Sequence, residues 1–168
     1  ADMIKNLQSF YKPSEGIFTN NSMCHLLDDV LLISGKAARN KGIEFKKNYK
    51  SVEYSFEGIE DQIKQVLLNI LQNSIDSISA GGEIVLNMAQ NSKEIILEIQ
   101  DTGSGIRAED KKFIFDPFFS TKGKLGTGLG LSVSYGIIKK HGGDISIDSE
   151  LNIGSTITLV LPRKRKKI

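Results

Sequence analysis

"DQIKQVLLNILQNSIDSIS" (residues 61–79) is predicted to form one long helix with two unlike faces. Its apolar residues recur at helical spacing and give a stripe for burial, made of Ile63, Val66, Leu67, Ile70, Leu71 and Ile75. The opposite face is polar and nearly uncharged, with Gln62, Gln65, Asn69, Gln72, Asn73 and Asp76. A solvated face would use Lys, Glu and Arg, because Asn is about 0.5 kcal/mol less favourable than Ala inside a helix. The polar face therefore fits a ligand-binding surface or a satisfied surface stripe equally well.

Further helices and strands are expected on both sides of this helix. Helical periods cover 22–40, ended by Gly42, and 129–140, ended by Gly142-Gly143, while Gly81-Gly82 are expected to end the helix over 61–79. Strands are expected over 43–47, 52–56, 83–88, 94–100, 144–148 and 155–161. The short connections at 89–93 and 149–154 favour antiparallel pairing. The predicted fold class is α/β, a two-layer sandwich of a mixed, mostly antiparallel sheet and three helices.

Composition restricts the classes of protein that this chain can represent. Its 168 residues suit one domain, and 39% hydrophobic with 25% charged residues is typical of a soluble globular protein. No apolar run approaches the roughly 18 residues of a membrane helix. The single cysteine, Cys24, excludes an intrachain disulfide and fits a cytoplasmic location. A net charge of +2 does not indicate nucleic-acid binding, and the basic cluster over 163–167 is interpreted as a solvated tail.

A second polar motif is Asp101-Thr102-Gly103-Ser104-Gly105, which follows a strand expected to be buried. A carboxylate at this place can accept a hydrogen bond from an exocyclic amine at the floor of a pocket. The two glycines let the backbone turn and come close to a flat ligand. A simple turn at the end of a strand is the alternative, since Asp and Gly are common there.

The remaining motifs are a glycine-rich turn and the loop before it. Gly126-Thr127-Gly128-Leu129-Gly130-Leu131 opens a helix, and N–H groups at a helix N-terminus favour phosphate. The spacing is neither that of a dinucleotide fold nor that of a Walker loop. In Asp116-Pro117-Phe118-Phe119-Ser120-Thr121-Lys122, the aromatic pair needs a partner surface and Lys122 can meet phosphates as a point charge. The alternative is a loop anchored by its aromatic residues, with a solvated lysine.

Together these motifs, in this order and spacing, resemble the histidine kinase catalytic domain. "QVLLNILQNSIDSI" (65–78) is similar to the N box of that family, "DTGSGI" (101–106) to the G1 box, "IFDPFFSTK" (114–122) to the F box, and "GTGLGLSVSYGIIKKHGG" (126–143) to the G2 box. The family belongs to an ATPase superfamily with gyrase B, the Hsp90 chaperones and MutL, and the resemblance implies its Bergerat ATP-binding fold. The short lid resembles that of nitrogen-regulatory-type kinases.

The resemblance also divides the chain. "MIKNLQSFYKPSEG" (3–16) is similar to the end of a second dimerisation helix and its linker, with a helix expected over 1–12. The division is therefore 1–16 for that helix end and linker, 17–162 for the catalytic and ATP-binding domain, and 163–168 for the basic tail. His25 and His141 do not match the acceptor motif of the family, so the phosphorylated histidine is expected on another part of the kinase.

Roles for individual residues follow from the resemblance. Asn73 would bind Mg²⁺, Asp101 would bind the adenine amino group, and the segment from Gly105 to Gly128 would form a mobile lid. Asn69 stands where gyrase-type relatives carry a catalytic glutamate, and an amide cannot activate water as a carboxylate does. Asn69, Asn73 and Lys122 are the expected catalytic residues. The further residues expected to contact ATP are Asp76, Gly103, Gly105, Ile106, Phe118, Gly126, Thr127, Gly128, Leu129, Gly130, Leu131 and Thr156.

The expected activity is transfer of the ATP γ-phosphoryl group, with Mg²⁺, to a histidine on the dimerisation domain of the same kinase. The receiver domain of a response regulator would be the next partner, with no nucleic acid and no direct membrane contact. Two alternatives stay open: an ATPase of the gyrase, Hsp90 or MutL type, and a non-catalytic interaction module. The sequence departs from the family at Ser74, often Ala, and at Gln72, often charged.

Overall fold

The computed structural model describes residues 16–50, 52–121 and 126–165. The expected helix over 1–12, Lys122 and the end of the basic tail lie outside these residues. The helices and strands are β1 (Thr19–Ser22), α2 (Met23–Asn40), β2 (Ile43–Asn48), β3 (Ser55–Gly58), α3 (Glu60–Ser77), β4 (Gly82–Gln90), β5 (Glu94–Asp101), the 3-10 helix η1 (Lys111–Phe113), α4 (Gly130–Lys140), β6 (Asp144–Glu150) and β7 (Gly154–Pro162).

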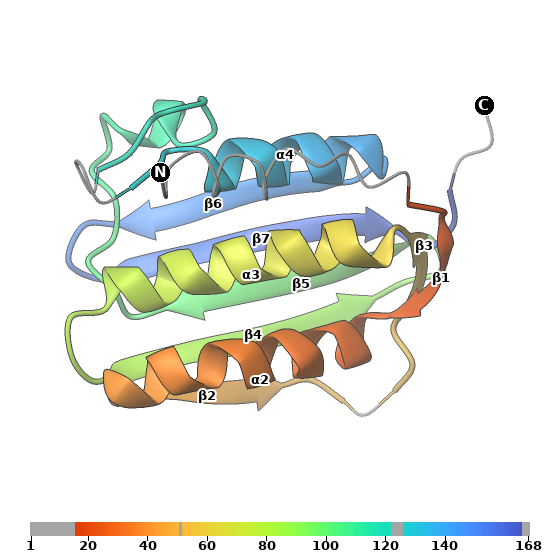
Figure 1. Cartoon of the computed structure of the whole chain (residues 1–168), viewed down its shortest axis with the longest axis horizontal. Helices are drawn as coiled ribbons and strands as arrows, with labels where there is room; N and C mark the ends of the chain where they lie inside the picture. The colour runs from red at the N-terminus through yellow and green to blue at the C-terminus, as the bar shows by residue number, and fades with distance from the viewer. Residues whose placement is uncertain (1–15, 51, 122–125, 166–168) are drawn as a thin grey trace, which may run out of the picture.

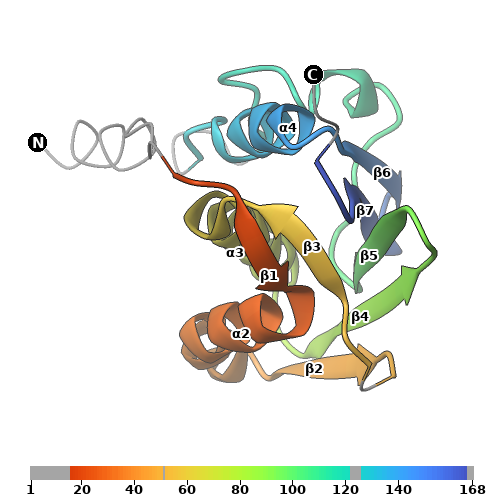
Figure 2. The same ribbon diagram turned by 90° about the vertical axis from the view of Figure 1, so that its right-hand side faces the viewer.

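A five-stranded sheet in the order β2-β4-β5-β7-β6 forms one layer of the molecule. Strand β2 pairs with β4 in parallel, and the other neighbours pair antiparallel. Helices α2, α3 and α4 cover one face of this sheet, and the opposite face carries no helix in the described part of the chain (Figures 1 and 2). The predicted two-layer sandwich with a mixed, mostly antiparallel sheet is confirmed, as are its two antiparallel hairpins, β4–β5 and β6–β7.

The core lies between the helices and the sheet. The predicted stripe of α3 is fully buried, since its six apolar residues are at most 1% exposed. Alternate residues of the strands meet it from the other layer, because side chains along a strand point to opposite faces. These sheet residues are Ile84 and Leu86, Ile95, Leu97 and Ile99, Ile145, and Ile157, Leu159 and Leu161. The helical layer is therefore held firmly against the sheet at the place where the polar motifs lie.

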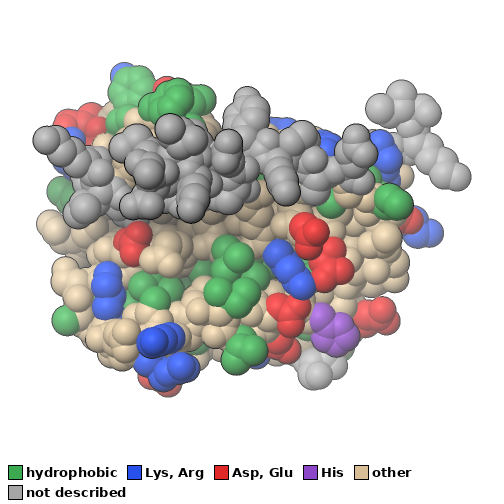
Figure 3. Space-filling view, in the orientation of Figure 1, with side chains coloured by type: hydrophobic (Ala, Val, Ile, Leu, Met, Phe, Trp, Pro, Cys, Tyr) green, Lys and Arg blue, Asp and Glu red, His purple; other side chains and the backbone are tan. Residues whose placement is uncertain are grey.

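The helical face also carries charges of both signs. Figure 3 shows acidic side chains around basic ones over the first turns of α2 and α3. Lys64 of α3 pairs there with Asp29 of α2 and with Glu60 of its own helix, each at 2.8 Å.

None of the described helices is both long enough and apolar enough to cross a membrane.

Two boundaries and one additional strand differ from the sequence prediction. Helix α3 ends at Ser77 because Ile78 is extended and packs into the core at 3% exposure, so the Gly81-Gly82 pair forms the turn into β4. Strand β3 begins only at Ser55, and Val52 is 46% exposed. Strand β1 was not expected; it pairs antiparallel with β3 in a separate two-stranded sheet.

Candidate functional site

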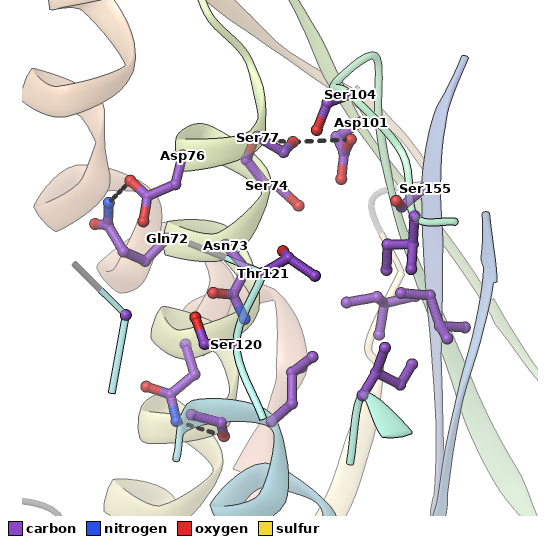
Figure 4. A pocket seen from close by; sticks show the side chains of 18 of the residues that line it. Gln72, Asn73, Ser74, Asp76, Ser77, Asp101, Ser104, Ser120, Thr121 and Ser155 are labelled. Atoms are coloured by element: carbon purple, nitrogen blue, oxygen red, sulfur yellow. Dashed lines mark hydrogen bonds between the residues drawn. The ribbon is translucent and has the colours of Figure 1, made fainter. Parts of the chain in front are cut away.

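A pocket of about 580 Å³ opens between the C-terminal half of α3, the beginning of α4 and the end of β5 (Figure 4). The polar face of α3 forms one wall, and strands β6 and β7 contribute to the wall opposite. Most of the residues predicted to bind nucleotide line this pocket. They are Asn69, Asn73, Asp76, Asp101, Gly105, Ile106, Gly126, Thr127, Gly128, Gly130 and Leu131. Motifs that lie far apart in the sequence therefore meet around one cavity.

Asp101 forms one end of the pocket. It is the last residue of β5, a central strand, and its side chain is 5% exposed. Its Oδ1 accepts the N–H of Gly103 at 2.9 Å and the hydroxyl of Ser77 at 3.2 Å. A Cβ at residue 103 would lie 1.9 Å from Ser77 Oγ, so only glycine fits between Ser77 and Asp101. The carboxylate is thus fixed in position and can accept hydrogen bonds from a ligand.

The polar face of α3 has two parts. Asn69 Nδ2 donates to the carbonyl of Gly130 at 3.2 Å and to Ser134 Oγ at 3.3 Å, which joins α3 to the first turn of α4. One turn further along, Gln72 Nε2 donates to Asp76 Oδ1 at 2.7 Å on the exposed side of the helix. Asn73 lies between these two pairs and is half-buried in the pocket wall. Asn69, Gln72, Asn73 and Asp76 of the predicted polar face thus line the pocket, whereas Gln62 and Gln65 lie outside its lining.

The glycine-rich turn leads directly into α4 at the other end of the pocket. Gly128 has φ +67°, and a Cβ there would lie 2.4 Å from the carbonyl carbon of Phe118. The first N–H groups of a helix have no partner within the helix and carry a partial positive charge. The described helix α4 has no acidic residue in its first turn to neutralise that charge. This end of the pocket is therefore suited to an anion such as phosphate.

The two aromatic residues of the preceding loop, Phe118 and Phe119, occupy different positions relative to the pocket. Phe119 lines the pocket, whereas the Phe118 side chain is 75% exposed and lies outside the lining. Phe118 has φ +67°, and its N–H donates to the carbonyl of Gly128 at 2.9 Å. A left-handed backbone is uncommon for a large side chain and is unfavourable by roughly 1–3 kcal/mol. The backbone of Phe118, and not its ring, supports the glycine turn, and its neighbour Phe119 is the aromatic residue of the lining.

Gly103, Leu129 and Thr156 also lie outside the pocket lining. The N–H of Gly103 donates to Asp101 and so helps to hold the carboxylate in place. Leu129 is the residue directly before α4. Thr156 points to the other face of the sheet, because its neighbours Ser155 and Ile157 line the pocket and successive strand residues alternate. Residues that the sequence prediction missed also line it. They are Gln72, Ser74, Ser77, Ser79, Ser104, Ile114, Phe119, Ser120, Thr121, Ile147, Ser155 and Ile157.

A magnesium ion fits this pocket only with few protein ligands. Among the described residues, no three His, Cys, Asp or Glu side chains gather into a metal-binding group. Mg²⁺ prefers oxygen ligands, keeps several waters and is commonly held by one or two protein groups together with phosphates. The amide oxygen of Asn73 in the pocket wall and the carboxylate of Asp76, at the exposed edge of the lining, are suitable oxygen donors. These residues therefore fit the ion that the sequence analysis expected.

Both histidines lie away from the pocket. His141 follows the last residue of α4, whose first residue, Gly130, lines the pocket. The N–H of Ile59 donates to His141 Nε2 at 3.0 Å, and Nδ1 lies 2.7 Å from the carbonyl of Ile137. Burial lowers the pKa of His141, and neighbouring Lys140 and Arg165 add to this. His25 is exposed in the first turn of α2 and is not part of the pocket lining.

A sandwich of this topology, with a buried carboxylate at one end of its pocket and a glycine-rich helix start at the other, defines a nucleotide-binding domain of the ATPase class. Residues 58–165 match the family described as "Histidine kinase-, DNA gyrase B-, and HSP90-like ATPase". Because the match covers most of the chain, the protein belongs to this family, and within it the chain is a catalytic domain of the histidine kinase type.

Known proteins agree with this assignment. The chain is 34% identical over 163 residues to sporulation kinase C of Bacillus subtilis, covering 96% of the chain and 38% of that kinase. It therefore spans well under half the length of this relative. The nucleotide-free catalytic domain of histidine kinase ThkA is 31% identical, with a TM-score of 0.80 over 88% of this chain and 99% of that structure. A structure of ThkA in complex with response regulator protein TrrA is 26% identical, with a TM-score of 0.82 over 99% of this chain and 48% of that structure.

Proposed function

We propose that this domain binds ATP with Mg²⁺ and transfers the γ-phosphoryl group to a histidine on the dimerisation domain of the same kinase. The observation that carries the proposal is the placement of Asp101 and the glycine turn at opposite ends of one pocket. A buried acceptor suits the exocyclic amine of adenine, and the helix start suits the phosphates. Gly103 and Leu129 belong to the proposed site as its support, through Asp101 and through the turn.

Phosphoryl transfer needs positioning and neutralisation of charge more than covalent help from the protein. In the reaction the bond from the γ-phosphorus to the bridging oxygen of ADP breaks, and a bond to an imidazole nitrogen forms. When bound, Mg²⁺ would neutralise phosphate charge, with Asn73 as its main protein ligand and Asp76 beside it. The start of α4 would hold the phosphates, and Lys122, from the segment before the glycine turn, is proposed to add a positive charge.

Asn69 separates this proposal from an ATPase of the gyrase or chaperone type. An amide cannot take a proton from an attacking water as a carboxylate can. Both hydrogens of its Nδ2 are also directed to α4, toward Gly130 O and Ser134 Oγ. The domain should therefore hydrolyse ATP slowly and keep the phosphoryl group for a protein acceptor.

The acceptor is proposed to come from outside the domain. Neither histidine of the chain lies at the pocket, and His141 is separated from the phosphate end by the full length of α4, about 17 Å for its 11 residues. We propose that residues 1–16 connect the domain, residues 17–162, to the dimerisation helices that carry the acceptor. The receiver domain of a response regulator is the proposed next partner, because the related kinase ThkA is known in complex with a response regulator protein.

Mixing the chain with a separately made dimerisation fragment of its kinase and γ-labelled ATP tests this proposal. The fragment should become labelled while the chain does not, and a fragment with its acceptor histidine replaced by glutamine should stay unlabelled. Acid-labile label on the chain itself, removed by His25→Ala or His141→Ala, would contradict an external acceptor. Rapid release of free phosphate by the chain alone would favour the ATPase alternative.

A further inference from the structure

The side chain of Ser74 is a buried polar group that the proposed function leaves without a task. It lies on α3, lines the pocket and is 2% exposed. Its hydroxyl oxygen is buried, and no described residue gives it a hydrogen-bond partner. Burying a hydroxyl without a partner is unfavourable, and such groups are rare in folded proteins. This position therefore calls for a partner from outside the described chain.

Other serines show that the α-helices of this domain can satisfy a hydroxyl internally. Ser134, also buried, donates to the carbonyl of Gly130 one turn earlier at 2.8 Å. The single hydroxyl hydrogen of Ser77 is shared between the carbonyl of Ser74, at 2.8 Å, and Asp101 Oδ1, at 3.2 Å. A buried serine inside a helix can satisfy its hydroxyl by bonding back in this way to a carbonyl of the preceding turn. Ser74 does not use it, and its hydroxyl is directed into the space between α3 and the sheet (Figure 4).

Ser74 lies at the same end of the pocket as Asp101. Ser77 connects the two, because its hydroxyl reaches both the Ser74 carbonyl and Asp101 Oδ1. The pocket end thus offers a fixed acceptor, the carboxylate, and next to it a hydroxyl that can donate. Adenine presents the complementary pair, an amino donor beside a ring nitrogen that accepts. Guanine presents an oxygen acceptor at the position of that amino group, which would face the carboxylate.

We infer that the Ser74 hydroxyl reads the base, donating directly or through one water to a ring nitrogen beside the amino group bound by Asp101. This inference rests on the proposed binding of ATP and adds a second residue to recognition of its base. The hydroxyl is unfavourable in the empty domain and becomes satisfied when nucleotide binds. Ser74→Ala should therefore weaken ATP binding without lowering the stability of the empty domain. Replacement of a merely structural serine would not have this combination of effects.

The experiment measures affinity for ATP, 1-deaza-ATP and 7-deaza-ATP by calorimetry in the wild type, Ser74→Ala and the control Ser34→Ala. Ser34 is also a buried serine on a helix, α2, but lies outside the pocket lining. Ser74→Ala should bind ATP about three- to tenfold more weakly, equivalent to about 0.7–1.4 kcal/mol. Its melting temperature without nucleotide should be unchanged or higher by up to about 4 °C. Ser34→Ala should bind ATP as the wild type does.

The deaza analogues identify the contact. The wild type should bind one of the two analogues about three- to tenfold more weakly than it binds ATP. Ser74→Ala should bind that analogue and ATP equally well, because the substitution and the missing ring nitrogen remove the same hydrogen bond. Ser74→Cys, which keeps the volume but donates weakly, should resemble Ser74→Ala and serves if that variant does not fold. Equal ATP affinity in the wild type and the Ser74 variants would overturn this inference alone. The same holds if, for both analogues, the loss of affinity caused by the analogue adds to the loss caused by the substitution. A wild-type domain that binds no ATP would overturn the proposed function as well.

Discussion

Replacing Asp101 by asparagine tests the base-binding end of the pocket most directly. The substitution keeps size and shape, and the asparagine oxygen can take over both internal hydrogen bonds, from the Gly103 N–H and the Ser77 hydroxyl. Its amide nitrogen then occupies the place of the second carboxylate oxygen. A donor at that place faces the donor of the adenine amino group, so one hydrogen bond to a charged acceptor is lost.

The expected magnitude follows from that loss. Hydrogen bonds to charged groups contribute roughly 1.5–3 kcal/mol, which corresponds to about 10- to 150-fold weaker ATP binding. Folding should change little, by less than about 1 kcal/mol, because both internal hydrogen bonds have an acceptor in the variant. Calorimetric titration with ATP and urea unfolding measure the two quantities separately.

Asp148→Asn is the matched control, since Asp148 is an exposed strand residue of β6 and not part of the pocket lining. It should leave ATP affinity unchanged. Purine riboside triphosphate, which lacks the amino group, should bind the wild type and Asp101→Asn with similar, low affinity. An Asp101→Asn domain that binds ATP as tightly as the wild type would refute the assignment of the base to this end of the pocket.

Two further predictions concern the lid and the buried histidine. Amide hydrogen exchange over 107–121 should slow when ATP and Mg²⁺ are added, because Ile114, Phe119, Ser120 and Thr121 line the pocket; equal protection with and without nucleotide would count against a lid. Burial lowers the pKa of His141 below 6.5, so the unfolded chain takes up the proton more readily and the domain should lose stability as the pH falls through about 6.5. Between pH 7.5 and pH 5.5 the unfolding free energy should therefore fall more for the wild type than for His141→Gln. An equal fall in both proteins would show that the imidazole does not cause the effect.

The sequence was most informative where hydrophobic periodicity and burial agree. The stripe of α3 was predicted because each of its apolar residues meets the core. The two antiparallel hairpins were predicted from the short connections between their strands. Periodicity failed at β1, since its four residues, Thr19–Ser22, contain no apolar side chain to alternate. It also misplaced the end of α3, because burial of Ile78 favours an extended residue before the first glycine is reached.

The site was predicted better by motif than by side-chain direction. A motif indicates which segments meet but not which neighbour faces the ligand, as Phe118 and Phe119 show. For Thr156 the information was present, since Ile157, Leu159 and Leu161 mark the buried face of β7 and place Ser155 on the same side. The unpartnered hydroxyl of Ser74 could not be found from the sequence, because its neighbours decide whether a serine bonds back to its own helix.

The two ends of the pocket differ in how they are built, and this bears on product inhibition. Asp101 closes a central strand held by neighbours on both sides, whereas the opposite end is a glycine turn ahead of a helix. A base held at the strand end is common to ATP and ADP, so the contacts made there bind substrate and product equally and do not speed the transfer. Preference for ATP can arise only where the third phosphate lies. A domain built this way should be inhibited by its own product, and its output should follow the ratio of ATP to ADP more closely than the amount of ATP.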